Sequence, residues 1–359
     1  MFVLREVHDR DIDELEILAS HLDTLNLPAD RERLGALIKR SRKSFGGQLP
    51  HQDREYLFGM TEGDRLVGTC MIIAQHGTFE RPAVYFNIIP EQKYSRTLKK
   101  YFVHQVLQLS FNFDGSTEIG GLILDPELQG HPMKLGKLLS FVRFLFIGMN
   151  RDSFRDSITA ELLPELNADG TSDLWECLGA NFTELSYREA DRLSRENVEF
   201  IRSLFPQTPI YTALLPKHVR EKVGVVGAPT KPVEKMLRSI GFEWDRSIDP
   251  FDGGPTFVCR TDECRMVSRT HRSRFTGILT GTGGEGRALV ASDKERDEIR
   301  FWATLCRYER TPTGYRIDER AAEALGVEEE QGIGILPLTG RDIEDFHRVN
   351  SDEGQWEKL

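Results

Sequence analysis

The pattern of apolar positions predicts a chain that mixes strands and helices. Near the N-terminus, period-two alternation indicates a strand, and Asp9 or Asp11 can cap the helix that follows. Two apolar runs on either side of a polar turn that contains glycine indicate a β-hairpin. Up to residue 89, the predicted elements are strands at 2–7, 56–60, 66–74 and 83–89 and helices at 12–19 and 34–38.

The middle of the chain predicts a β-α-β unit. Residues 118–124 read as a strand, 125–134 as a loop and 135–149 as a strongly apolar helix. Residues 157–162 then return as a strand. Two strands that are joined by a helix are expected to pair in parallel.

Two later segments share the phrase helix, glycine, strand. The first has a helix at 174–179 and a strand at 181–185, and the second has a helix at 232–240 followed by Gly241 and extended residues 242–244. The phrase can be a weak internal repeat or a common junction that occurs twice.

Beyond residue 281 the pattern becomes rich in strands. Strands are predicted at 287–292, 299–308 and 332–338, with a short helix at 319–325. The predicted organisation is 1–190, 191–275 (a second part that completes the acceptor site), a small β-rich domain 281–340 and a charged tail 341–359.

Composition narrows the class of protein. With 359 residues and 39% hydrophobic content, the chain can fill one large core or two. The net charge of −10 disfavours nucleic acid as a partner and suits a cationic substrate. The five cysteines give no zinc-ligand spacing, so no metal is expected and the thiols should be reduced. No secretion signal or bilayer-spanning stretch is visible, which predicts a cytoplasmic protein that does not contact a membrane.

The loop before the apolar helix is a candidate site for phosphates. The amides at a helix N-terminus attract anions, and Gly130 and Gly136 permit a close approach of the backbone. Lys134 and Lys137 add positive charge. The alternative is a flexible loop that merely precedes a core helix.

Two other positions invite a chemical role. Glu161 is a carboxylate inside an apolar strand, where it can serve as a base, bind a cation, or simply point outward. The turn at 249–256 is elaborate for a connector and could place Asp252 against a positive ligand. In contrast, the G-x-G-x-x-G pattern at 281–286 precedes a strand-like run, so we interpret it as a linker.

Several exact phrases resemble arginine N-succinyltransferases of the GNAT acyltransferase superfamily, in the family's order and approximate spacing. They are residues 124–126, 138–140, 143–144, 160–161, 175, 178–179, 209–212, 241–242 and, above all, 252–256 with Cys259. The resemblance implies an α/β (α+β) fold with a mixed central GNAT-like sheet flanked by helices. It also implies a small C-terminal β-rich domain and leaves a second GNAT-like half open.

The resemblance further implies transfer of a succinyl group from succinyl-CoA to the α-amine of L-arginine or ornithine. Succinyl-CoA would be a co-substrate, with no permanently bound cofactor, and the chain would form a homo-oligomer. Glu161 would be the catalytic residue. The substrate-binding residues would be Asp252, Gly253, Gly254 and Tyr211. The CoA-binding residues would be Leu122, Leu124, Gly130, His131, Lys134, Gly136 and Lys137, with the amides near Leu122 to Leu124 holding the oxyanion.

The sequence also departs from the family. The family's phosphate loop starts with an arginine and is two residues shorter, whereas this chain has Gln129 or His131 near that position. Leu162 to Pro164 replace a family triplet that contains a charged residue. Gln207 to Pro209 lack the family's histidine. Three hypotheses therefore remain: the succinyltransferase, an N-acyltransferase with another acyl-CoA or amine, and a non-catalytic protein that binds CoA or an amino acid.

Overall fold

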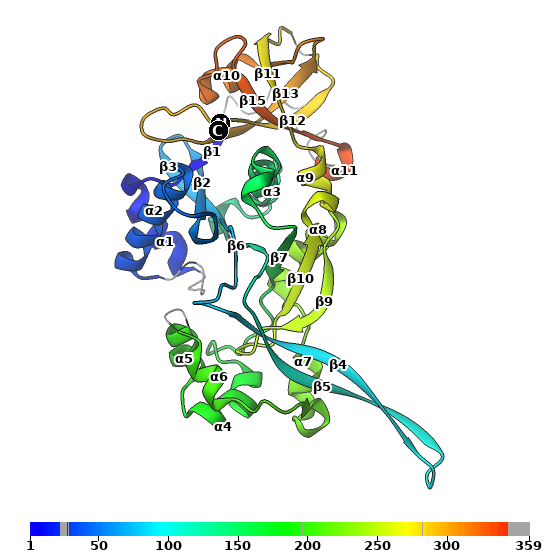
Figure 1. Ribbon diagram of the computed structural model, residues 1–359. Coiled ribbons are helices and arrows are strands. Elements are labelled where there is room, and N and C mark those ends of the chain that lie inside the picture. The colour runs from blue at the N-terminus through cyan, green and yellow to red at the C-terminus, as the bar shows by residue number, and fades with distance from the viewer. Residues whose placement is uncertain (22–26, 28, 195–196, 282, 344–359) are drawn as a thin grey trace. The chain divides into compact units, whose positions relative to one another are not determined.

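The computed structural model describes residues 1–21, 27, 29–194, 197–281 and 283–343 (Figure 1). The chain divides into two compact units that are built from separated stretches of sequence. Unit 1 comprises Met1–Ala74, Ile119–Phe154 and Asp262–Leu359, and unit 2 comprises Gln75–Glu118 and Arg155–Thr261. The domain boundaries expected from sequence therefore stay a prediction. Residues 344–359 of the expected tail lie outside the described residues.

Unit 1 opens with the strand, two helices and antiparallel hairpin that the sequence predicts, and continues through the end of a strand into the apolar helix. The elements of this part are β1 (Phe2–Glu6), α1 (Ile12–Ser20), α2 (Arg31–Phe45), β2 (Glu55–Glu62), β3 (Arg65–Ile73), β6 (Thr117–Leu124, in this unit from Ile119) and α3 (Leu135–Met149). Asp11 stands at the N-cap of α1, but its carboxylate binds Arg5 at 2.7 Å instead of capping the helix.

The rest of unit 1 forms a small closed barrel. Its elements are α9 (Arg265–Arg269), β11 (His271–Ile278), β12 (Gly286–Ser292), β13 (Trp302–Arg310), β14 (Tyr315–Ile317), α10 (Glu319–Leu325), β15 (Gly332–Leu338) and α11 (Gly340–Ile343). The strands pair in the cycle β12, β15, β11, β14, β13 and back to β12. Closure removes free edges, and β13 also pairs with β1, with Leu4 opposite Ala303. The predicted β-rich region is confirmed, and Gly281 precedes a strand as expected.

Helix α3 packs on β3 and is tied to β6 by one buried cation. Nearly every α3 side chain is buried, Arg143 included. The Arg143 guanidinium donates to Ser140 Oγ at 2.7 Å and to the Gly120 carbonyl at 3.3 Å. These bonds satisfy a buried charge that would otherwise destabilise the fold, and they tie the middle of α3 to β6.

Unit 2 contains a mixed sheet with short helices. Its elements are β4 (Ala83–Ser95), β5 (Lys100–Asn112), β7 (Ser157–Glu161), a π-helical turn (Trp175–Gly179), α4 (Ala180–Thr183), α5 (Tyr187–Ser194), α6 (Glu199–Leu204), β8 (Ile210–Tyr211), α7 (Lys217–Lys222), α8 (Lys231–Ser239), β9 (Glu243–Ile248) and β10 (Pro255–Arg260). The strand order is β7, β10, β9, β4, β5, β8. The first residues of β6 pair in parallel with β7, Thr117 opposite Ile158, which confirms the predicted parallel pairing.

One predicted strand in unit 2 is wrong. Residues 181–183 belong to helix α4. Glu184, the C-cap of this helix, adopts the left-handed conformation with φ 57°. Gly179 keeps helical dihedrals, and a Cβ there would collide with the ring of Trp175, so the glycine serves packing rather than a helix end. Thr183 Oγ1 donates to the Gly179 carbonyl at 3.0 Å and continues the helical pattern. The first of the two helix–glycine–strand segments therefore lacks its strand, and the possible internal repeat is not present there.

Two glycines of unit 1 make a matched stability test. A Cβ on Gly68 in β3 would lie 2.8 Å from the Ile123 carbonyl oxygen, whereas a Cβ on Gly35 in α2 would meet no atom within 4 Å. We expect Gly68→Ala to lower the free energy of unfolding by about 1–3 kcal/mol through overpacking. Gly35→Ala should raise it by about 0.5–1 kcal/mol through helix propensity. Denaturant unfolding measures the change in unfolding free energy for both variants. Changes of equal sign would contradict the close approach of Gly68 in β3 to Ile123 in β6.

Candidate functional site

The loop before α3 presents backbone amides that the protein itself does not use. The Lys137 and Leu138 amides both donate to the Lys134 carbonyl, at 2.8 and 3.2 Å. In the described residues, the amides of Leu135 and Gly136 donate to no acceptor. Free amides at the start of a buried helix form an anion site.

The shape of this loop depends on two unusual backbone positions, and a third position leaves open space. Gly130 has φ 78° and Lys134 has φ 49°, so both adopt the left-handed conformation. A Cβ on Gly136 would meet no atom within 4 Å, which leaves open space beside the free amides. The predicted phosphate loop thus has room for a ligand at the backbone.

Two of the predicted CoA-binding side chains are engaged elsewhere. His131 Nδ1 accepts from the Met133 amide at 3.1 Å, and its ring packs edge-on against Phe2 with centroids 5.4 Å apart. Lys137 Nζ donates to the Asp342 carbonyl at 3.3 Å. Backbone amides therefore define this site more than side chains do.

Strand β6 carries the other two predicted CoA-binding residues. Leu122 and Leu124 are half-buried and alternate with buried Ile123. The Asp125 amide donates to the Val67 carbonyl of β3 at 2.8 Å. Because successive amides of a strand point to opposite edges, those of Leu122 and Leu124 point away from β3.

In unit 2, Glu161 ends β7 among other acidic groups. It lies opposite Thr256 of β10, next to the turn at 249–254, and retains accessible surface. Desolvation by the surrounding protein, followed by the charges of Glu118 and Asp249, raises the pKa of Glu161 to about 8. The Glu161 carboxyl group is thus accessible, and its pKa lies close to neutral pH.

The turn that holds Asp252 is stabilised by two of its own carboxylates. Asp249 Oδ1 accepts from the amides of Phe251 and Asp252 at 2.7 and 3.0 Å. Asp252 Oδ1 accepts from the Gly254 amide at 2.7 Å. Desolvation raises the pKa of Asp249 to about 6, and desolvation together with the Asp249 charge raises the pKa of Asp252 well above its usual value.

The two glycines of this turn are required by its geometry. Gly253 has φ 80°, a conformation that other residues rarely adopt. A Cβ on Gly254 would lie 2.5 Å from the Leu162 carbonyl oxygen. These residues shape the turn beside Glu161, and their part in substrate binding stays a prediction.

His76 and Glu118 join the acidic residues, and the sequence alone did not single them out. His76 Nδ1 lies 2.6 Å from Glu118 Oε2, and Glu118 is buried. Desolvation would lower the pKa of His76, but the charges of Glu118, Glu161 and Asp249 outweigh it and raise the pKa to about 9. His76 is therefore a cation at neutral pH.

The electrostatic balance of this cluster favours a bound cation. Raised pKa values of Glu161, Asp249 and Asp252 mean that their negative charges are poorly compensated. Asp191 adds to the potential at both aspartates. We call Glu118, Glu161, Asp249, Asp252 and His76 the acidic cluster. A cationic ligand supplies the charge that it lacks.

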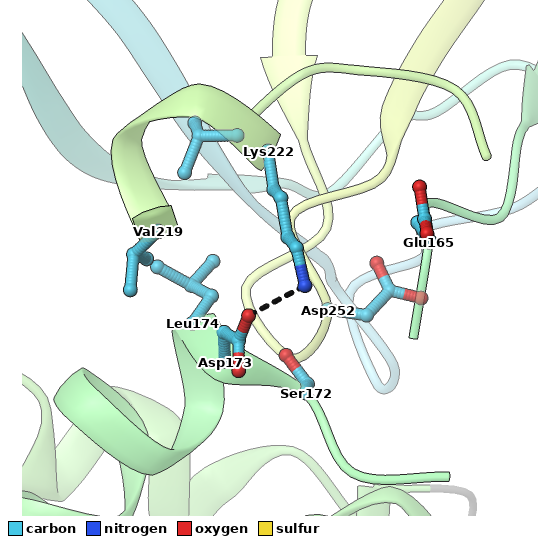
Figure 2. A pocket seen from close by; sticks show the side chains of 8 residues that line it. Glu165, Ser172, Asp173, Leu174, Val219, Lys222 and Asp252 are labelled. Carbon is cyan, nitrogen blue, oxygen red and sulfur yellow. Dashed lines mark hydrogen bonds and ion pairs between the residues drawn. The ribbon is translucent and has the colours of Figure 1, made fainter. Parts of the chain in front are cut away.

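A small pocket lies beside Asp252 (Figure 2). Asp252 and Glu165 are among the residues that line it, and Lys222 Nζ reaches Asp173 at 2.7 Å. Side-chain hydrogen bonds from Lys222 and then Asn167 lower the pKa of Asp173. The pocket wall thus combines three carboxylates with one lysine.

Tyr211 is placed apart from the acidic cluster. Its hydroxyl donates to Glu91, and its ring meets His104 edge-on at 5.6 Å. Among the described residues, no contact joins it to Glu161 or Asp252. Its assignment to substrate binding stays a prediction.

Two residues of the acidic cluster that the sequence analysis did not single out, Glu118 and Asp249, could have been found from the sequence. Glu118 begins an apolar strand exactly as Glu161 ends one, and Asp249 opens the same turn as Asp252. His76 had no such signal, because its pairing with Glu118 depends on residues 42 positions apart. Among the described residues, no group of histidine, cysteine, aspartate and glutamate could hold a metal ion, and no helix is long and apolar enough to cross a membrane.

Comparisons with known proteins place this chain in a family. The family model "AstA: Arginine N-succinyltransferase beta subunit" matches residues 2–266. An arginine N-succinyltransferase of Citrobacter koseri is 33% identical over 82% of this chain and 86% of its own length. One of Escherichia coli O6:K15:H31 is 32% identical with the same coverage.

A solved structure agrees. Arginine/ornithine succinyltransferase subunit AI from Pseudomonas aeruginosa superposes with a TM-score of 0.78 and 26% identity, over 94% of this chain and 99% of that one. Sequence relatives and three-dimensional likeness therefore cover nearly the same large part of the chain. The chain belongs to the arginine N-succinyltransferase family.

Proposed function

We propose that the chain transfers a succinyl group from succinyl-CoA to the α-amine of L-arginine or ornithine. The observation that carries this function, beside family membership, is the acidic cluster with its uncompensated negative charge. Both proposed acceptors are cations at neutral pH. The cluster is thus suited to bind the acceptor before any chemistry occurs.

The carboxylates around Asp252 are suited to the cationic side chain of the acceptor. A guanidinium forms paired, charge-assisted hydrogen bonds with carboxylates, and Asp252 and Glu165 both line the small pocket. Gly253 and Gly254 hold Asp252 in place through the turn. Lys222 neutralises Asp173, which limits the number of free carboxylates in the wall.

Glu161 serves as the base in this proposal. An α-ammonium has a pKa of about 8, close to that of Glu161, so the proton transfer is nearly balanced in free energy. The freed amine attacks the thioester carbonyl carbon. A carbon–nitrogen bond forms and the carbon–sulfur bond breaks. Glu161 has taken one proton of the ammonium, and the second nitrogen proton passes to the departing sulfur, so that CoA leaves as the thiol.

The phosphates of succinyl-CoA fit the free amides at Leu135 and Gly136, beside Gly130 and Lys134. Anion binding by backbone amides explains how a chain without the family's loop arginine can still hold a polyanion. The amides of Leu122 and Leu124 are suited to stabilise the oxyanion of the tetrahedral intermediate.

A cytoplasmic location belongs to the same proposal. Cys70, Cys177, Cys259, Cys264 and Cys306 are all free thiols. Free thiols are typical of a reducing compartment, which is also where acyl-CoA thioesters are used.

The function is tested by following thiol release from succinyl-CoA or acetyl-CoA with a panel of amines. We expect release with succinyl-CoA plus arginine or ornithine, and little release with acetyl-CoA or with neutral amino acids, because these lack the second positive charge. Release with a different pair would replace the proposed substrates. Binding of both ligands without release would mark a non-catalytic protein.

Gly136→Ala tests the phosphate site. Because a Cβ there meets no protein atom, the variant should fold at least as stably as the parent, yet the methyl group should obstruct an anion at the free amides. We expect the KM for succinyl-CoA to rise at least about tenfold, or about 1.4 kcal/mol. Gly35→Ala, a helical glycine with equal space, is the control, and an unchanged KM would remove the phosphates from this helix end.

Glu161→Gln tests the proposed base. We expect kcat to fall by about 10²–10⁴-fold with the fold retained, while Glu243→Gln on the exposed side of β9 changes little. In the parent enzyme kcat/KM should rise with pH through about 8, because only ionised Glu161 accepts a proton. Bound arginine lowers that pKa, so the limb in kcat should lie at lower pH. Parental rates in Glu161→Gln would discard this role.

A further inference from the structure

The most prominent unexplained feature is the hairpin of β4 and β5, which extends beyond the other elements of unit 2 (Figure 1). Each strand has thirteen residues, and their register runs without a break from Ala83 opposite Asn112 to Ser95 opposite Lys100. Neighbouring strands pair only with its base: β9 at Phe86 and Asn87, and β8 at Val106 and Leu107. We call residues 90–104 the arm.

One face of the hairpin changes from core to surface along its length. Alternation places Phe86, Leu107 and Leu109 on the same face, and all three are buried in the core of unit 2. Further out, the same face carries Tyr94, Tyr101 and Val103.

The outer part of this face has no cover within the described residues. Tyr94, Tyr101 and Val103 are 51%, 76% and 60% exposed. Among the described residues, the rings of the two tyrosines contact each other, with centroids 4.6 Å apart. A contiguous apolar face on a projecting two-stranded ribbon is characteristic of an interaction surface.

The opposite face of the arm is partly covered by the chain itself. Tyr211 binds Glu91, and Phe102 stacks on His104 with centroids 6.2 Å apart. Lys93 also pairs with Glu91. The face with Tyr94, Tyr101 and Val103 is therefore the one that lacks partners.

The charge of the arm indicates what covers that face. Residues 90–104 contain four cations, Lys93, Arg96, Lys99 and Lys100, and a single carboxylate, Glu91, although the whole chain has a net charge of −10. The rest of the chain is accordingly more acidic than the average suggests. A basic, aromatic arm is complementary in charge to the remaining residues of the chain, whose net charge is negative.

We propose that the arm docks on the acidic body of a second copy of this chain, through Tyr94, Tyr101 and Val103, and so joins chains into an oligomer. Docking removes the apolar face from water, which stabilises the assembly. The basic residues around the arm tip add charge complementarity and set the orientation. This inference is independent of the proposed reaction.

The experiment measures the mass of the full chain in solution by light scattering and sedimentation, across concentration. We expect the parent to be oligomeric. Tyr101→Asp combined with Val103→Asp should raise its dissociation constant at least about tenfold with an unchanged circular dichroism spectrum. Lys99→Glu combined with Lys100→Glu should weaken the assembly in the same direction, most clearly at low salt.

The matched control is Phe79→Asp combined with Phe113→Asp, which places the same two negative charges on exposed aromatic positions outside the arm. It should leave the mass unchanged. A parent that stays monomeric at every concentration would overturn the inference. So would an arm variant that keeps the parental mass, or a control that dissociates the oligomer as fully as the arm variant does.

Discussion

The properties of the acidic cluster in unit 2 follow from one constraint: its carboxylates are crowded together with too little positive charge beside them. Glu161, Asp249 and Asp252 are brought together by the pairing of β7 with β10 and by one tight turn, and His76 is occupied by Glu118. Keeping such carboxylates ionised is costly where water is displaced, so their pKa values rise. A cationic ligand relieves that cost. The same shift brings Glu161 near the pKa of an amine, so in the proposed reaction substrate binding and proton transfer have one physical origin.

The proposed phosphate site in unit 1 relies on the backbone instead of on side-chain charges. It relies on backbone amides at the start of α3, left free because Lys134 adopts the left-handed conformation and its carbonyl takes the bonds from Lys137 and Leu138. Arg143, buried and bonded to Gly120, holds α3 against β6. Because such a site needs few side chains, the loop can differ from that of its relatives and still bind an anion.

The two strand-rich additions differ in how they treat their edges. The C-terminal barrel closes on itself through β12 and β13 and buries its apolar residues in its own core. The arm leaves its edges and one apolar face open. A closed barrel resists association, whereas an open ribbon invites it. This contrast is why we assign an intermolecular contact to the arm and none to the barrel.

The sequence by itself determined the local elements and much of the chemistry. Helical periodicity located α3 at residues 135–149, alternation located β6 and β7, and the resemblance pointed to Glu161, Asp252 and the loop at Gly136. These features depend on neighbouring residues, which a pattern reports directly. Tertiary structure decided the rest. The 181–185 segment became helical through packing around Trp175, and the partnership of His76 with Glu118 and the raised pKa values arise from residues distant in sequence. Burial and electrostatic potential are properties of the folded chain, so no local pattern contains them.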